Sequence, residues 1–115
     1  MAASLTQEQL LLLDNLMYVS DVTSKEYKSV AKLIEAYNSG DLVLNKSNLS
    51  GGFESNINQM KEILDAISKD PQLMSLGIDS SIDGVFRATC FVQYDAYGKE
   101  VGHIVAFRGT GGIYD

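Results

Sequence analysis

Apolar residues recur at helical spacing through the first two-thirds of the chain, and the pattern predicts three helices there. The first is expected to begin at Thr6, because Thr6 and Gln9 fit a capping box. The same pattern recurs at Thr23 and Glu26, so the second is expected to begin there and to end at Gly40. The first helix has a wide apolar face, which indicates burial against more than one element; its members are Leu10, Leu12, Leu13, Leu16, Met17 and Val19.

A third helix is expected over about residues 54–69. Its apolar stripe consists of Met60, Ile63, Leu64 and Ile67. Asp70 followed by Pro71 resembles an N-cap with a first-turn proline, so a short helical turn is expected next, ended by Gly77. The helical part of the chain is therefore predicted to cover residues 5–76.

The period of the pattern changes to two from Val85, which predicts a strand through Tyr94 with one face apolar. A turn containing glycine follows, and then a second strand from about Val101 to Phe107, so residues 85–108 are expected to form a β-hairpin. The second strand is apolar on both faces, which is typical of a strand inside an α/β sheet covered on both sides. Because two strands cannot make such a sheet, we expect the sheet to be incomplete in this chain.

Composition narrows the choice of function. The 115 residues suffice for one domain or part of one, and 15 acidic against 9 basic residues give a net charge of −6. The bases are scattered, so the surface should repel phosphate backbones, and we expect no nucleic-acid partner. Cys90 is the single cysteine, which excludes an intrachain disulfide, and its place in a strand predicts a buried thiol. The N-terminus has no basic segment or long apolar run, so the cytoplasm is the default compartment, with leaderless export left open.

The end of the chain resembles a known family. Residues 104–110, Ile-Val-Ala-Phe-Arg-Gly-Thr, resemble the strand and turn of class 3 lipases, the fungal triacylglycerol-lipase-like branch of the α/β-hydrolases. Residues 11–18 are similar to the opening helix of an uncharacterised bacterial lipase-like group. The resemblance implies that residues 1–115 are the N-terminal portion of a lipase-like α/β-hydrolase domain, with an oxyanion-type turn at 108–112.

The resemblance also implies roles for the residues of that turn. Ester hydrolysis passes through a tetrahedral oxyanion, which needs hydrogen-bond donors in place before the charge develops. Thr110 would donate its N–H and its hydroxyl to the oxyanion, and Gly109 and Gly111 would let the substrate approach the backbone closely. Arg108 is expected to pair with a structural carboxylate. Without the resemblance, Thr110 would be interpreted as a turn cap.

The catalytic triad of such an enzyme is absent from the sequence. No Gly-x-Ser-x-Gly pentapeptide occurs, and His103 precedes the turn, whereas the family's catalytic histidine follows the serine. We therefore interpret His103 as structural. The expected function is the N-terminal part of a serine esterase or lipase that hydrolyses carboxylic, lipid-like esters, inactive alone because the nucleophile is missing. The alternative is a non-catalytic interaction module that self-associates, for instance as a homodimer through open sheet edges.

Two further motifs are weaker. Residues 79–84 match the first half of a calcium loop, but Cys90 occupies the position of the bidentate acid. Residues 109–112 resemble a nucleotide-binding turn, but Tyr114 stands where the third glycine would fall. We therefore expect no cofactor and no metal.

Overall fold

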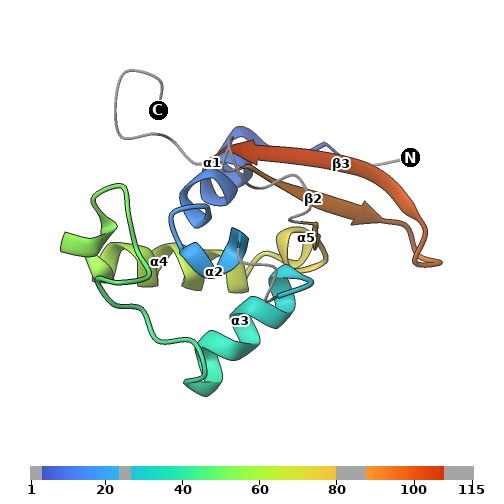
Figure 1. Ribbon diagram of the computed structural model, residues 1–115. Coiled ribbons are helices and arrows are strands. Elements are labelled where there is room, and N and C mark those ends of the chain that lie inside the picture. The colour runs from blue at the N-terminus through green and yellow to red at the C-terminus, as the bar shows by residue number, and fades with distance from the viewer. Residues whose placement is uncertain (1–3, 24–26, 80–87, 108–115) are drawn as a thin grey trace.

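The computed structural model describes residues 4–23, 27–79 and 88–107 of the chain. In this part of the chain, helices gather on one face of an open antiparallel sheet, which makes a mixed α/β fold (Figure 1). The elements, in chain order, are α1 (Gln7–Leu16), α2 (Ser20–Thr23), α3 (Val30–Ser39), the 3₁₀ turn η1 (Phe53–Ser55), α4 (Ile57–Ser68), α5 (Pro71–Met74), β1 (Gly77–Asp79), β2 (Ala88–Tyr94) and β3 (Glu100–Phe107).

The predicted start of α1 is confirmed. The Gln9 N–H donates to Thr6 Oγ1 at 3.1 Å, and the Thr6 N–H donates to Gln9 Oε1 at 2.8 Å, which completes the capping box. The predicted apolar face is buried at Leu13, Leu16, Met17 and Val19, although the last two follow the end of the helix. Leu10 was assigned to this face wrongly: 37% of it is exposed.

The predicted start of the second helix is wrong. Thr23 is the last residue of α2, and α3 begins after Ser29, whose hydroxyl accepts from the Lys32 N–H at 3.1 Å. The physical reason is pairing with distant residues: the Ile78 N–H donates to the Lys28 carbonyl at 2.9 Å. The chain before Val30 is thereby held beside β1, so the local capping pattern is overridden. The predicted end at Gly40 is confirmed, with φ at 88° in the left-handed region.

The predicted stripe of α4 is confirmed, since Met60, Ile63, Leu64 and Ile67 are all buried. Asp70 caps α5 as expected, and its carboxylate accepts from the Gln72 and Leu73 N–H groups. Gly77 does not end a helical turn as predicted but begins β1. None of the helices described has the length and the apolar run that crossing a bilayer requires.

The loop before α4 is tied to the end of α1. The Ser50 N–H donates to the Tyr18 carbonyl at 3.1 Å, and the Tyr18 ring lies 5.6 Å from the Phe53 ring, centroid to centroid. Gly51 has φ of 68° and passes so close to Tyr18 that an added Cβ would lie 2.3 Å from the ring. Glycine is therefore needed here both for its backbone conformation and for its size.

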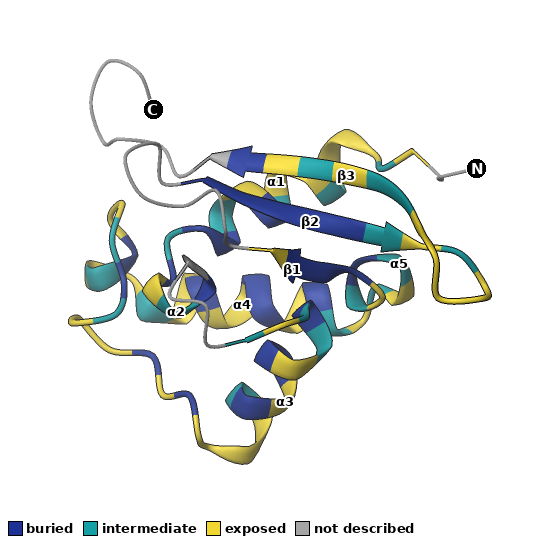
Figure 2. Ribbon diagram, turned by 45° about the vertical axis from the view of Figure 1, so that its right-hand side comes forward, coloured by how far each residue is buried: buried dark blue, intermediate teal, exposed yellow. Residues whose placement is uncertain are grey.

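The sheet has three strands in the described part of the chain, not the two that the sequence predicted. The order is β1-β2-β3, both pairs are antiparallel, and Ile78, Phe91 and Ile104 form one row across the strands. β2 is central, and its first five residues, Ala88 to Val92, are buried (Figure 2). The sequence pattern predicted that β3 is the strand covered on both faces, and this is wrong. β2 is that strand, because β3 lies at an edge and Val105 is 48% exposed.

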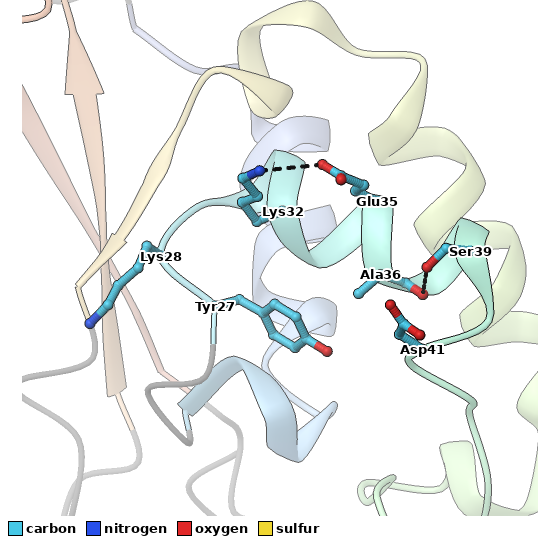
Figure 3. A pocket seen from close by; sticks show the side chains of 7 residues that line it. All are labelled: Tyr27, Lys28, Lys32, Glu35, Ala36, Ser39 and Asp41. Carbon is cyan, nitrogen blue, oxygen red and sulfur yellow. Dashed lines mark hydrogen bonds and ion pairs between the residues drawn. The ribbon is translucent and has the colours of Figure 1, made fainter.

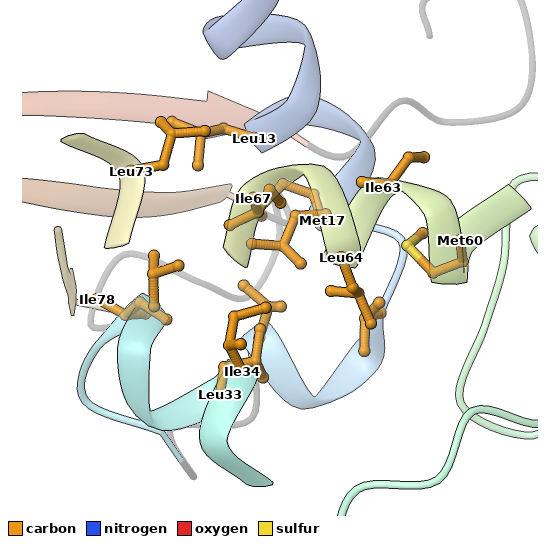
Figure 4. Packing of buried hydrophobic residues seen from close by; sticks show 14 of the residues in the cluster. Leu13, Met17, Leu33, Ile34, Met60, Ile63, Leu64, Ile67, Leu73 and Ile78 are labelled. Carbon is orange, nitrogen blue, oxygen red and sulfur yellow. The ribbon is translucent and has the colours of Figure 1, made fainter. Parts of the chain in front are cut away.

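The hydrophobic core joins the helices to one face of this sheet. Leu13, Met17, Ile34 and Ile67 meet at its centre from α1, α3, α4 and the turn after α1 (Figure 4). Phe91 enters from the middle of β2 and is fully buried. Close packing of this kind fixes the position of the sheet relative to the helices.

Candidate functional site

The residues of the predicted oxyanion turn follow β3 directly in the chain. Thr110, Gly109 and Gly111 lie outside the described residues, as does Arg108. The structure does describe the strand that leads to them, because β3 ends at Phe107. The described residues therefore include the strand that leads to the predicted turn but not the turn itself.

The strand that precedes the predicted turn is held firmly on one side. β3 pairs with β2 in continuous register from Gly102 opposite Gln93 to Phe107 opposite Ala88. On the helix side of the sheet, Ala106 is 2% exposed and Ile104 packs against the core. A strand anchored by a packed core is a precise support for a group that must act at its end.

Thr89 is a residue that the sequence analysis did not single out. It lies opposite Ala106, next to the end of β3, and is fully buried. Its Oγ1 has no hydrogen-bond partner among the residues described. Burying an unpaired hydroxyl costs free energy. The alternating pattern placed Thr89 on the polar face of its strand, so only the structure could show that it is buried.

His103 lies on the outer face of the sheet, away from the helices. Its Nε2 lies 3.8 Å from Glu100 Oε1, and both side chains are more than half exposed. An exposed pair of this kind contributes little to stability. The structural interpretation of His103 stays a prediction.

The Cys90 thiol is buried, as the sequence predicted. Burial raises the pKa of the Cys90 thiol, and the negative charges of Asp79, opposite it on β1, and of Glu100 raise it further. Because the thiolate and not the thiol is nucleophilic, these surroundings make Cys90 unreactive near neutral pH.

A surface pocket of about 370 Å³ lies beside α3 (Figure 3). Its polar groups are already partly paired: Lys32 Nζ lies 3.6 Å from Glu35 Oε2, and the Ser39 hydroxyl donates to the Ala36 carbonyl. It has no histidine or cysteine among its described lining residues, which are Tyr27, Lys28, Lys32, Glu35, Ala36, Ser39 and Asp41. The one serine nucleophile among these residues, Ser39, donates to a backbone carbonyl and not to a base, so this pocket shows no catalytic pair.

The two weaker motifs fall largely outside the described residues. Of the half calcium loop only Asp79 is described, as the last residue of β1, and residues 80–84 are not. The glycine-rich residues 109–112 are also outside. Over residues 4–23, 27–79 and 88–107, no three histidine, cysteine or acidic side chains are grouped as a metal ion would require.

In comparisons with known proteins, no family model, no curated protein and no solved structure matches the chain.

Proposed function

We propose that this chain is the N-terminal part of a serine esterase or lipase of the α/β-hydrolase type, acting on carboxylic, lipid-like esters. The observation that carries the proposal is the position of β3. This apolar strand ends at Phe107, directly before Arg108-Gly109-Thr110, whose sequence resembles the lipase motif. Backbone N–H groups of a turn that follows such a strand are not used in the hydrogen bonds of the sheet, so they can bind a substrate oxygen.

In this proposal the turn stabilises the oxyanion. Thr110 would donate its backbone N–H and its hydroxyl to the charge that develops on the substrate carbonyl. Gly109 and Gly111 would allow the ester to approach, because they carry no side chain. Loss of one such donor typically costs about 3–4 kcal/mol in the activation free energy.

The nucleophile, the base and the orienting acid would lie in residues encoded after Asp115. The chain itself has no Gly-x-Ser-x-Gly, so on this proposal it does not hydrolyse esters alone. The reading frame should continue with that pentapeptide, followed by an acid and a histidine. A stop codon directly after Asp115 would contradict the proposal.

The decisive assay uses the extended protein and p-nitrophenyl esters. Thr110→Ala should lower kcat about 100- to 1,000-fold, because it removes a donor that acts in the transition state. Thr110→Ser is the matched control, since it keeps the hydroxyl and should retain most of the activity. Unaltered thermal unfolding of both variants would show that the loss is chemical. Equal turnover in Thr110→Ala and the wild type would refute the role of Thr110.

A further inference from the structure

Thr89 is the one buried polar side chain among the residues described, and its hydroxyl has no hydrogen-bond partner there. The side chain has no exposed surface, so bulk water cannot supply the missing partner. A hydroxyl has one donor and two acceptor positions, and leaving all of them unused in the interior costs free energy. Valine would fill the same volume without that cost. A threonine at this position therefore calls for a partner outside the described residues.

The position of Thr89 in the sheet narrows the choice of partner. β2 and β3 are antiparallel, so the first residues of β2 lie beside the last residues of β3, with Thr89 opposite Ala106 and next to the strand end at Phe107 (Figure 2). Ala106 carries only a methyl group and offers no partner. On the other side, β1 ends at Asp79 before it reaches Thr89. The chain that leaves β3 after Phe107 thus begins its course beside this hydroxyl.

The peptide between Gly109 and Thr110 needs a hydrogen-bond donor on the side away from the substrate. A trans peptide is planar, and its N–H and C=O groups point in opposite directions. When the Thr110 N–H points at the substrate carbonyl, as the proposed function requires, the Gly109 carbonyl points away from the substrate and back toward the protein. A backbone carbonyl that is shielded from water must be paired. Glycine also allows this peptide to rotate with little hindrance, so its orientation has to be fixed from outside the turn.

We propose that Thr89 fixes this orientation: its hydroxyl donates to the Gly109 carbonyl oxygen and thereby holds the Thr110 N–H toward the substrate. The inference rests on the proposed function, because the direction of that N–H matters only where an oxyanion forms. Thr89 is then a positioning residue and not a catalytic one, since it contacts the turn and not the ester. The turn must bend toward the helix face, because in extended backbone Gly109 would lie about 10 Å beyond Ala106.

The central strand is a suitable place for such a positioning group. β2 is paired on both sides, by β1 and by β3, and its neighbour Phe91 is fully buried in the core. A side chain held on a packed strand can fix a mobile glycine peptide more precisely than a side chain on a loop could. The hydrogen bond forms in the complete protein, where residues encoded after Asp115 hold the turn in place. Stability of the 115-residue chain and activity of the extended protein should therefore rank variants at Thr89 differently.

The test measures hydrolysis of p-nitrophenyl esters by the extended protein. Thr89→Val should lower kcat about 10- to 100-fold and leave KM within about twofold, because the lost hydrogen bond acts through the transition state. Thr89→Ser is the matched control: it keeps the donor, so its kcat should stay within about threefold of the wild type, although it loses a packed methyl group. A valine variant as active as the wild type, or a kcat that follows stability across the two variants, overturns the proposal.

A second readout does not need hydrolysis. The ¹³C chemical shift of the Gly109 carbonyl, in extended protein labelled at glycine carbonyls, reports whether that oxygen accepts a hydrogen bond. Thr89→Val should move this resonance and Thr89→Ser should not. A Gly109 signal that is the same in both variants and the wild type overturns the proposal.

The outcome also separates this proposal from the proposed function. An extended protein that hydrolyses no ester refutes the proposed function, whatever the Gly109 signal shows. A lower kcat in Thr110→Ala beside an unchanged kcat in Thr89→Val refutes only the role of Thr89.

Discussion

The hydroxyl of Thr89 is buried without a hydrogen-bond partner among the described residues, which lowers the free energy of unfolding. It lies on the buried face of the central strand, and its only neighbour across the ladder toward β3 is Ala106, which has no polar side chain. Buried hydroxyls are nearly always hydrogen-bonded, so an unpaired one is an exception that needs a specific explanation. Thr89 lies next to the end of β3, where the predicted turn begins.

Thr89→Val should therefore stabilise the chain. Valine keeps the shape of threonine and removes the unpaired hydroxyl, so the free energy of unfolding should rise by about 1–2 kcal/mol. Urea unfolding followed by circular dichroism measures the change. Thr89→Ser is the control, because it keeps the hydroxyl and loses a methyl group, and it should destabilise. A destabilised valine variant would mean that the hydroxyl has a partner in solution.

At the scale of elements, α1 and α5 are joined through one carboxylate. Asp70 accepts from two N–H groups of α5, and Gln9 of α1 donates its Nε2–H to Asp70 Oδ2 at 3.0 Å. The Gln9 hydrogen bond, helped by the two backbone hydrogen bonds, lowers the pKa of the Asp70 carboxyl below its ordinary value. Gln9 thus serves two caps, because it also completes the capping box of α1.

This carboxylate should give stability that depends on pH. Its pKa is lower in the folded than in the unfolded chain, so its contribution is complete above the unfolded value of about 4 and is lost as the pH falls through the folded value. Asp70→Asn keeps one acceptor for the cap but loses the charge and the acceptor for Gln9 Nε2, so it should lower stability at neutral pH and should flatten the loss in acid. Urea unfolding at several pH values tests this. Parallel pH curves for the variant and the wild type would contradict it.

The helix starts show how far a sequence can predict this fold. Thr6 with Gln9 and Thr23 with Glu26 have the same spacing, yet only the first pair begins a helix. The first pair is exposed, so neighbouring residues alone determine its backbone conformation. The chain after the second pair is held by the hydrogen bond between Lys28 and Ile78, about 50 residues apart. Local patterns fail where contacts distant in sequence determine the backbone.

The strands lead to the same conclusion. The hairpin was predictable because β2 and β3 are long and adjacent in sequence, but the three-residue β1 has too few positions for any period. For the candidate site, the motif pointed to Thr110, while the burial of Thr89 could not be inferred. Its strand is covered on both faces, and alternation no longer separates a buried face from an exposed one.

At the scale of the whole molecule, the two layers are joined by few large side chains. Phe91 is fully buried, and it stands in one row with Ile78 and Ile104 on the face toward the helices. The helices also contact one another, but the sheet meets the core through this row and the small side chain of Ala106. The position of β3, and with it of any turn that follows, thus depends on the packing around Phe91.

Phe91→Ala should accordingly loosen the sheet from the helices. Removal of a buried phenyl ring costs about 3–5 kcal/mol, a large share of the 5–15 kcal/mol that typically stabilises a domain. Tyr97→Ala is the matched control, since that ring is 94% exposed in the turn between β2 and β3, and it should cost less than about 0.5 kcal/mol. Urea unfolding gives both values, and hydrogen exchange of the β3 amides shows whether the sheet is released first. If β3 stays as protected as α4 in Phe91→Ala, the row through Phe91 is not what holds the sheet in place.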